Sequence, residues 1–169
     1  VYPFEAVGIE GTKGTIITNA VFRELIKSDK ILVRSQQDTA RAIEQIGLSQ
    51  SGHCTDDTCR VQAGKILKAQ KLIMGSIEKL DVNLYTVAIR VVDVETSRTE
   101  FSVERDCECS RIVEVRNLAK KLTREEILPY LETGKPPPKK EGPSGGYPPS
   151  PSRVEEAVPA AGPSPPGMV

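Results

Sequence analysis

The chain contains four cysteines, the residues whose chemistry depends most on how the sequence spaces them. Cys54 and Cys59 form a C-x4-C pair, and Cys107 and Cys109 form a C-x-C pair. An even number of cysteines favours two disulfides, with three pairings that the sequence does not distinguish. Pairing of Cys54 with Cys59 is the easiest, whereas a bridge between Cys107 and Cys109 would be strained by the geometry that a disulfide requires.

Two other states of the cysteines stay open beside the disulfides. A zinc site with four thiolate ligands requires tetrahedral geometry, and neither pair has the most common ligand spacing. Reduced core cysteines are the other alternative, because Cys59 lies on the apolar face of a predicted helix. All four cysteines are expected at one end of the sheet. The helix that carries Cys59 should run antiparallel to the strand that follows it, so the helix begins over the carboxyl end of that strand. Cys107 follows a strand that is parallel to that one and therefore reaches the same end. A metal- or thiol-active domain using the four cysteines is therefore an alternative function.

His53 is the only histidine, and it stands next to Cys54. A cysteine and a histidine can act as a nucleophile and its base. Neighbouring residues in one loop rarely direct their side chains at each other, however, and no second histidine could build a relay. We therefore predict that the protein is not an enzyme and has no catalytic residues, no resident metal and no cofactor.

Three glycines, Gly8, Gly11 and Gly14, lie between the first predicted strand and the first predicted helix, where nucleotide-binding folds hold phosphates. The phosphate-loop pattern is absent because Thr15 rather than Lys follows Gly14, and the pattern G-x-G-x-x-G is absent as well. A turn-forming connection is the preferred interpretation. Nucleotide binding by the Gly8–Thr15 loop is kept as an alternative function.

Apolar periodicity predicts one α/β domain over residues 1–134, with the order β-α-β-α-α-β-β-β-α on a single mixed sheet. A short strand and a helix come first, and Lys30–Val33 is predicted as the second strand. Ser35 and Asp38 form a variant of the capping box before the next helix, and Gly47 is expected to end it. After a third helix, three alternating strands form an antiparallel meander before a last helix, which Ser110 caps. Their alternation predicts that one face of the sheet is buried and the other wet or only partly covered.

Composition separates this domain from the rest of the chain. Of the 13 prolines, 11 lie between Lys135 and Val169, in a stretch that is also rich in glycine and serine. Such a segment lacks the apolar surface to offset the entropy of ordering, so residues 135–169 are predicted to be a disordered tail. Its P-x-x-P matches are expected from composition alone, which favours a spacer over a recognition motif.

The charge balance and hydropathy exclude two classes of partner. The 23 basic and 23 acidic residues give a net charge of zero, whereas a dedicated nucleic-acid-binding domain carries a basic face. We therefore predict no nucleic-acid partner. No apolar run is long enough to span a bilayer, so no transmembrane segment is predicted in this chain. Since Val1 rather than Met begins the sequence, a leader or a lipid anchor upstream of it is compatible with these observations.

The stretch VRSQQDTARAIEQIGLSQSG, from Val33 to Gly52, resembles a helix-entry segment of the CsgG-like and TolB amino-terminal-domain-like families of bacterial envelope proteins. The resemblance continues through residues 54–59, 64–69 and 72–77. It ends with RVVDVET, from Arg90 to Thr96, which is similar to a hairpin pattern of these families, with Ser97 in place of the usual glycine. Together these segments cover nearly all of residues 1–122 in the right order.

The resemblance implies an α/β fold like that of anticodon-binding domains, a periplasmic location and association with the outer membrane, often through a lipid anchor. It also implies an oxidising compartment, which favours disulfides. Ring-forming relatives carry long membrane-spanning hairpins, and the turns near residues 81–83 and 96–98 are too short for these. We therefore predict a non-enzymatic cell-envelope accessory or assembly module that binds another envelope protein or self-associates as a homo-oligomer.

Overall fold

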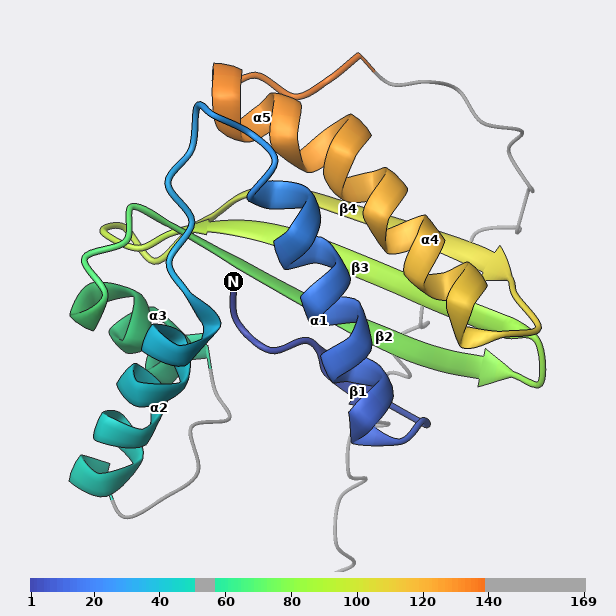
Figure 1. The fold of residues 1–169 in the computed structure, drawn as a ribbon, viewed down its shortest axis with the longest axis horizontal. Coiled ribbons are helices and arrows are strands. Elements are labelled where there is room, and N and C mark those ends of the chain that lie inside the picture. The colour runs from blue at the N-terminus through green and yellow to red at the C-terminus, as the bar shows by residue number, and fades with distance from the viewer. Residues whose placement is uncertain (51–56, 139–169) are drawn as a thin grey trace, which may run out of the picture. The chain divides into compact units, whose positions relative to one another are not determined.

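Alternating apolar and polar residues generate the three long strands of the sheet. The protein is represented by a computed structural model that describes residues 1–50 and 57–138. In it, β2 (Lys71–Asp81), β3 (Leu84–Asp93) and β4 (Thr99–Glu108) form an antiparallel meander. The short β1 (Glu5–Val7) pairs in parallel with β2, which gives the strand order β1-β2-β3-β4 (Figure 1). The predicted class, one α/β domain on a mixed sheet, is confirmed.

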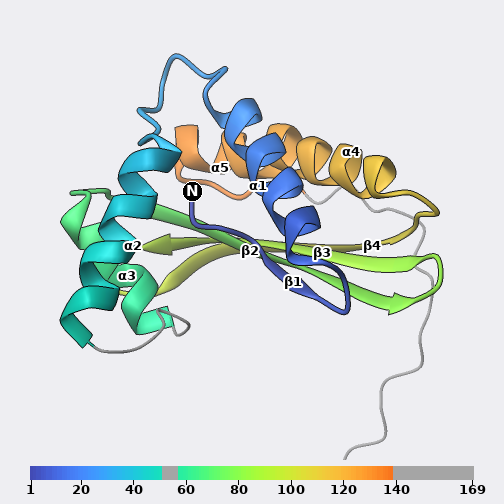
Figure 2. The same cartoon turned by 60° about the horizontal axis from the view of Figure 1, so that its bottom comes forward.

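Two helices cover one face of this sheet, α1 (Gly11–Leu25) and α4 (Ile112–Leu122) (Figure 2). The main core lies between them and the strands, because every second strand residue points to this side. Burying these branched side chains is the largest source of stability in such a domain. Its fully buried members come from both layers: Ile17, Val21 and Leu25 of α1, Ile77, Val87, Ile89 and Val91 of the sheet, and Val115 and Ala119 of α4.

A second, smaller core lies at one end of the sheet, beneath α2 (Gln36–Gln50) and α3 (Asp57–Ile66). Figure 2 shows both helices gathered at that end. The strand residues that contact them belong to the face opposite α1, because they alternate with the residues of the main core. These residues are Leu72 and Met74 of β2 and Val92 of β3, joined by Val94 just after it.

The last helix runs on past α4 through a π-helical segment, Thr123–Ile127, into α5 (Leu128–Thr133). Pro129 falls in the first turn of α5, where its missing N–H is tolerated, so the proline does not end the helix. Tyr130 of α5 stacks on Phe101 of β4 with a centroid distance of 4.7 Å. Gly134 then ends α5 in the left-handed conformation, which is the usual role of a C-terminal glycine.

Two expected features of the first half are wrong. Lys30–Val33 is not a strand but an extended connection between α1 and α2. Ile31 and Val33 are half-buried against the main core while Leu32 is 88% exposed. The alternating apolar side chains of this segment are therefore buried because they cover the edge of the main core, and the segment has no neighbouring strand. Gly47 does not end α2, which continues to Gln50, because glycine weakens a helix interior without forbidding it.

The expected capping signals are present in modified form. The Ser35 hydroxyl oxygen accepts a hydrogen bond from the Asp38 N–H at 3.1 Å, and the Ser35 hydroxyl donates to the Asp38 carboxylate at 2.7 Å. At the start of α4, Arg111 rather than Ser110 occupies the N-cap position. The Ser110 N–H instead donates to the Glu114 carboxylate at 2.8 Å. The predicted tail falls largely on residues 139–169, outside the described residues.

Candidate protein-binding face of the sheet

The sheet face opposite α1 and α4 carries the side chains that alternate with the main core. Because directly paired residues share a face, the strand register places Glu5, Ser76, Ala88 and Glu104 in one row across all four strands. The described helices α2 and α3 cover only one end of this face (Figure 2). We call the rest the open face; it comprises Glu5, Val7, Ser76, Glu78, Leu84, Thr86, Ala88, Arg90, Ser102, Glu104, Asp106 and Glu108.

A shallow pocket with a volume of about 290 Å³ lies in the middle of the open face. Its floor consists of small residues, Ser76, Ala88 and Ser102, on three adjacent strands. Glu104 stands on one side of the floor, and charged side chains near α3 stand on the other. Small side chains on a sheet face leave room for a side chain from another molecule, so the pocket can receive one without displacing the core.

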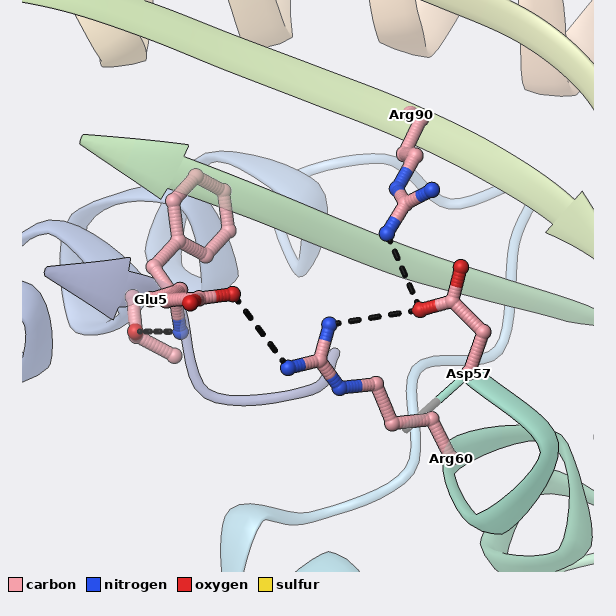
Figure 3. Close-up of polar contacts among 6 residues, drawn as sticks. Glu5, Asp57, Arg60 and Arg90 are labelled. Carbon is pink, nitrogen blue, oxygen red and sulfur yellow. Dashed lines mark hydrogen bonds and ion pairs between the residues drawn. The ribbon is translucent and has the colours of Figure 1, made fainter. Parts of the chain in front are cut away.

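A chain of four alternating charges lies beside this pocket next to α3, and three of its members line the pocket (Figure 3). Arg60 of α3 lies between two carboxylates, with its Nη atoms 3.4 Å from Glu5 and 3.4 Å from Asp57. Asp57 also binds Arg90 of β3, at 3.0 Å. The Arg60 guanidinium lies 5.3 Å from the centre of the Tyr2 ring. These contacts fix the start of α3 against β1 and β3 and hold two guanidinium groups at the pocket rim.

Tyr2 and Arg60 affect each other electrostatically. The Tyr2 ring is buried, and this burial raises the pKa of its hydroxyl, while the positive charge of Arg60 and a hydrogen bond from it act in the opposite direction. Tyr2 therefore stays neutral and provides an aromatic surface for the guanidinium, a contact that adds to the attraction of the two carboxylates. The position of Arg60 is thus set by an aromatic ring as well as by ion pairs.

The half of the open face away from α3 is acidic. Asp106 accepts a hydrogen bond from the Thr86 hydroxyl at 2.6 Å. Glu78, Glu104 and Glu108 are exposed, and the structure gives their carboxylates no hydrogen bond or ion pair to any described residue. Carboxylates held on a rigid sheet without internal partners favour a positively charged surface on whatever binds there.

The expected gathering of the cysteines at one end of the sheet is wrong. Cys59 is buried in the smaller core with Leu72, whereas Cys107 stands opposite Tyr85 near the other end of β3. The reason is that α3 is short and packs over the end where β2 begins, instead of running along the sheet. Without this convergence, the described cysteines offer no joint metal or thiol site.

Cys107 and Cys109 form a disulfide, the pairing expected to be strained. Their Cα atoms are 5.3 Å apart, within the ordinary range for a disulfide. The chain bends as it leaves β4, where the Cys109 N–H donates to the Asn83 carbonyl at 2.7 Å, and this bend brings the two residues together. Cys59 is also disulfide-bonded, while His53 and Cys54 lie outside the described residues.

The three glycines between β1 and the first turns of α1 are explained by packing and turn formation. Gly14 lies inside α1, and a Cβ there would come within 2.9 Å of the Phe4 carbonyl oxygen. Gly8 adopts a left-handed turn with φ of 70°, while Gly11 is the first residue of α1. Two of the three glycines therefore serve the turn and the close approach of α1 to β1, so packing and turn formation account for their presence.

The carboxylate of Asp93, at the end of β3, is held by partners within the protein. It accepts hydrogen bonds from the Lys71 ammonium at 2.8 Å and from the Thr96 N–H at 2.7 Å. These bonds, that from Lys71 first, hold the pKa of Asp93 well below its usual range. The ammonium of Lys71 also pairs with Glu100 at 2.6 Å, so the cluster fastens the β3–β4 turn to the start of β2.

Sequence reasoning did not identify Arg60, Arg90 or Glu5 as site residues. A signal existed for Arg90, because it interrupts the apolar run of β3 on the wet side of the strand. No signal existed for the pairing of Arg60 with Glu5, since these residues are 55 positions apart.

Within residues 1–50 and 57–138, no cluster of histidine, cysteine and acidic side chains could hold a metal ion, and no helix is long and apolar enough to cross a membrane.

Comparison with known proteins gives one family and several similar structures. The family model described as peptidoglycan-synthase activator LpoB matches residues 14–106. The LpoB C-terminal domain from Salmonella enterica is 17% identical with a TM-score of 0.49, covering 62% of this chain and 76% of that one. The same domain from Escherichia coli is 18% identical with a TM-score of 0.49, covering 62% and 77%. A PelC dodecamer from Paraburkholderia phytofirmans is 14% identical with a TM-score of 0.46, covering 72% and 81%. No curated protein matches the chain.

The fold is an α/β domain on a mixed sheet, one face of which is only partly covered by the described helices. The family match spans more than half of the sequence, so the chain belongs to the LpoB family of peptidoglycan-synthase activators. At the level of this family, it is a bacterial cell-envelope accessory protein that acts on another protein and is not itself an enzyme. The predictions of an envelope protein and of a protein–protein role are confirmed in this coarser form.

Proposed function

We propose that this protein activates a peptidoglycan synthase by binding it through the open face of the sheet. The observation that carries the proposal is the pocket floored by Ser76, Ala88 and Ser102, on the part of the sheet face that the described helices leave uncovered. A rigid sheet face with a central hollow and charged rims has the anatomy of a protein interface, in which an anchor side chain fills a pocket. Family membership supports a synthase as the partner.

The proposal includes the location of the protein. We place the domain in the periplasm, attached to the outer membrane, as its sequence resemblance to CsgG-like and TolB-like envelope proteins implies. Disulfides at the four cysteines belong to the same proposal because they persist in an oxidising compartment. The proline-rich residues 135–169 act as a spacer, since such segments are extended and semi-rigid.

The test is a substitution that fills the pocket. Ala88→Arg places a long charged side chain on its floor, and the partner's anchor side chain is then excluded. We expect the affinity for the purified synthase of the same organism to fall by about tenfold or more. Binding is measured by biolayer interferometry, and activation is measured as the rate of glycan-strand polymerisation with increasing amounts of the activator.

Asn117→Arg is the matched control, because Asn117 is exposed on α4, on the opposite side of the sheet. This variant introduces the same side chain and should bind and activate like the unmodified protein. The open face is not the interface if Ala88→Arg melts normally and still binds with unchanged affinity. The activator role itself is refuted if the unmodified protein neither binds the synthase nor changes its rate.

A further inference from the structure

One edge of the sheet is long and has no neighbouring strand. The strand order leaves β1 and β4 as the edges; β1 has only 3 residues, whereas β4 has 10. Every second residue of an edge strand directs its N–H and C=O groups away from the sheet, and these groups can pair with another chain. Among the described residues no strand occupies this position beside β4.

The side chains of β4 determine which strand can pair with it. Glu104, Asp106 and Glu108 follow each other at alternate positions, so their carboxylates form a line on the open face. On the other face of the strand, Arg105 already pairs with Glu126 at 3.2 Å. The charges of β4 that have no ion pair among the described residues are therefore negative, and they lie on the open face.

A second copy of the chain is a poor occupant of this edge. Antiparallel pairing of β4 with itself would place the carboxylates of the two copies opposite each other, and like charges in cross-strand positions are destabilising. Charged edge residues are a common means by which sheet proteins avoid such self-association. The complementary occupant is a strand whose open-face side chains are basic.

We propose that β4 receives an additional strand from the protein partner, and that this strand carries Lys or Arg at alternate positions on the open-face side. The inference rests on the proposed function, because it specifies how the partner is recognised. Main-chain hydrogen bonds along the edge give affinity, while the paired charges set the register. Ser102 and Glu104 belong both to β4 and to the pocket, so a strand added here lies directly beside the pocket and extends one continuous interface.

The experiment uses the full chain and a synthetic peptide of alternating lysine and threonine, as long as β4. A peptide of the same composition with its lysines in one block is the first control, because it has the same charge without the alternation. We expect the alternating peptide to bind about tenfold more tightly, since only it places a cation at each cross-strand position. Binding is followed by fluorescence anisotropy, and the site is mapped by amide chemical shifts.

The double variant E104K/E108K should weaken binding of the alternating peptide by about tenfold. The variant E44K/E95K is its control, because these two glutamates are exposed elsewhere and their replacement changes the net charge equally. In the unmodified protein, the largest amide shifts should lie in β4. This mapping supports or refutes the proposal independently of how well the variants fold.

Strand addition is overturned if the two peptides bind equally, if the shifts lie outside β4, or if light scattering gives a dimer that E104K/E108K dissociates. In each of these cases the synthase can still bind through the pocket, and a loss of synthase affinity in Ala88→Arg would still show this. Failure of strand addition is thereby distinguished from failure of the proposed function, for which synthase binding itself is absent.

Discussion

Replacing Gly75 with alanine is expected to lower the free energy of unfolding by about 3 kcal/mol, the cost of overpacking a rigid core. Gly75 lies in β2, and a Cβ at this position would overlap the ring of Phe4 and come within 2.6 Å of the Ala88 carbonyl oxygen. The ring cannot move aside freely, because Phe4 is only 6% exposed and belongs to the main core. The carbonyl oxygen cannot move either without distorting β3.

Gly11→Ala is the matched control for this substitution. A Cβ on Gly11 meets no atom within 4 Å, and the residue opens α1 with an ordinary helical backbone. Removing the flexibility of glycine there should leave stability unchanged or raise it by about 0.5 kcal/mol. Urea unfolding followed by circular dichroism measures both variants. Equal stability of Gly75→Ala and the unmodified protein would show that Phe4 does not pack over β2.

Much of the fold follows from local patterns in the sequence. The meander was predictable because alternation along β3 and β4 is strict and the turns between the strands are short. The same alternation predicted that one face of the sheet is wet or only partly covered, and the open face lies on that side. The predicted strand at residues 30–33 failed because apolar alternation also suits an extended segment that covers the edge of a core. Periodicity reports which side of a segment is buried, but not whether a neighbouring strand exists.

The candidate site was less predictable because its parts come from distant segments. Arg60 contacts Glu5 only because α3 packs at one end of the sheet, and no local sequence pattern specifies that position. The cysteines illustrate the same point. Their expected convergence assumed that α3 runs along β2, and a helix of 10 residues instead covers only the rim. The position at which a short helix packs depends on the hydrophobic core to which its apolar residues contribute, and here this is the smaller core around Leu72.

A buried carboxylate between the two helices of the main layer should control stability in acid. The side chain of Glu24 in α1 is 3% exposed, and its Oε1 lies 3.0 Å from the Lys27 ammonium and 3.3 Å from the Lys120 ammonium of α4. Burial raises the pKa of this carboxyl, but the hydrogen bonds and positive charges of the two lysines outweigh burial and hold it below the ordinary value of 4.5. The ionised form is therefore favoured by folding.

The sign of the pH dependence follows from this lowered pKa. Well above pH 4.5 the carboxyl is ionised in both the folded and the unfolded chain, so its contribution to stability is fully present. As the pH falls below that value, the unfolded chain takes up a proton before the folded one, and the contribution is lost as the pH passes through the folded pKa. Glu114 and Glu132 also have lowered pKa values and act in the same direction.

Glu24→Gln should therefore reduce the free energy of unfolding at pH 7 by about 2 kcal/mol, because the amide keeps the shape but leaves two ammonium groups without a counter-charge. It should also make the loss of stability between neutral and acidic pH shallower, since one proton-linked group has been removed. Urea unfolding at a series of pH values measures both effects. Glu44→Gln, at an exposed position of α2, is the control and should reproduce the unmodified curve. If the two variants give the same acid dependence, the contact between Glu24 and Lys120 does not hold α1 and α4 together in solution.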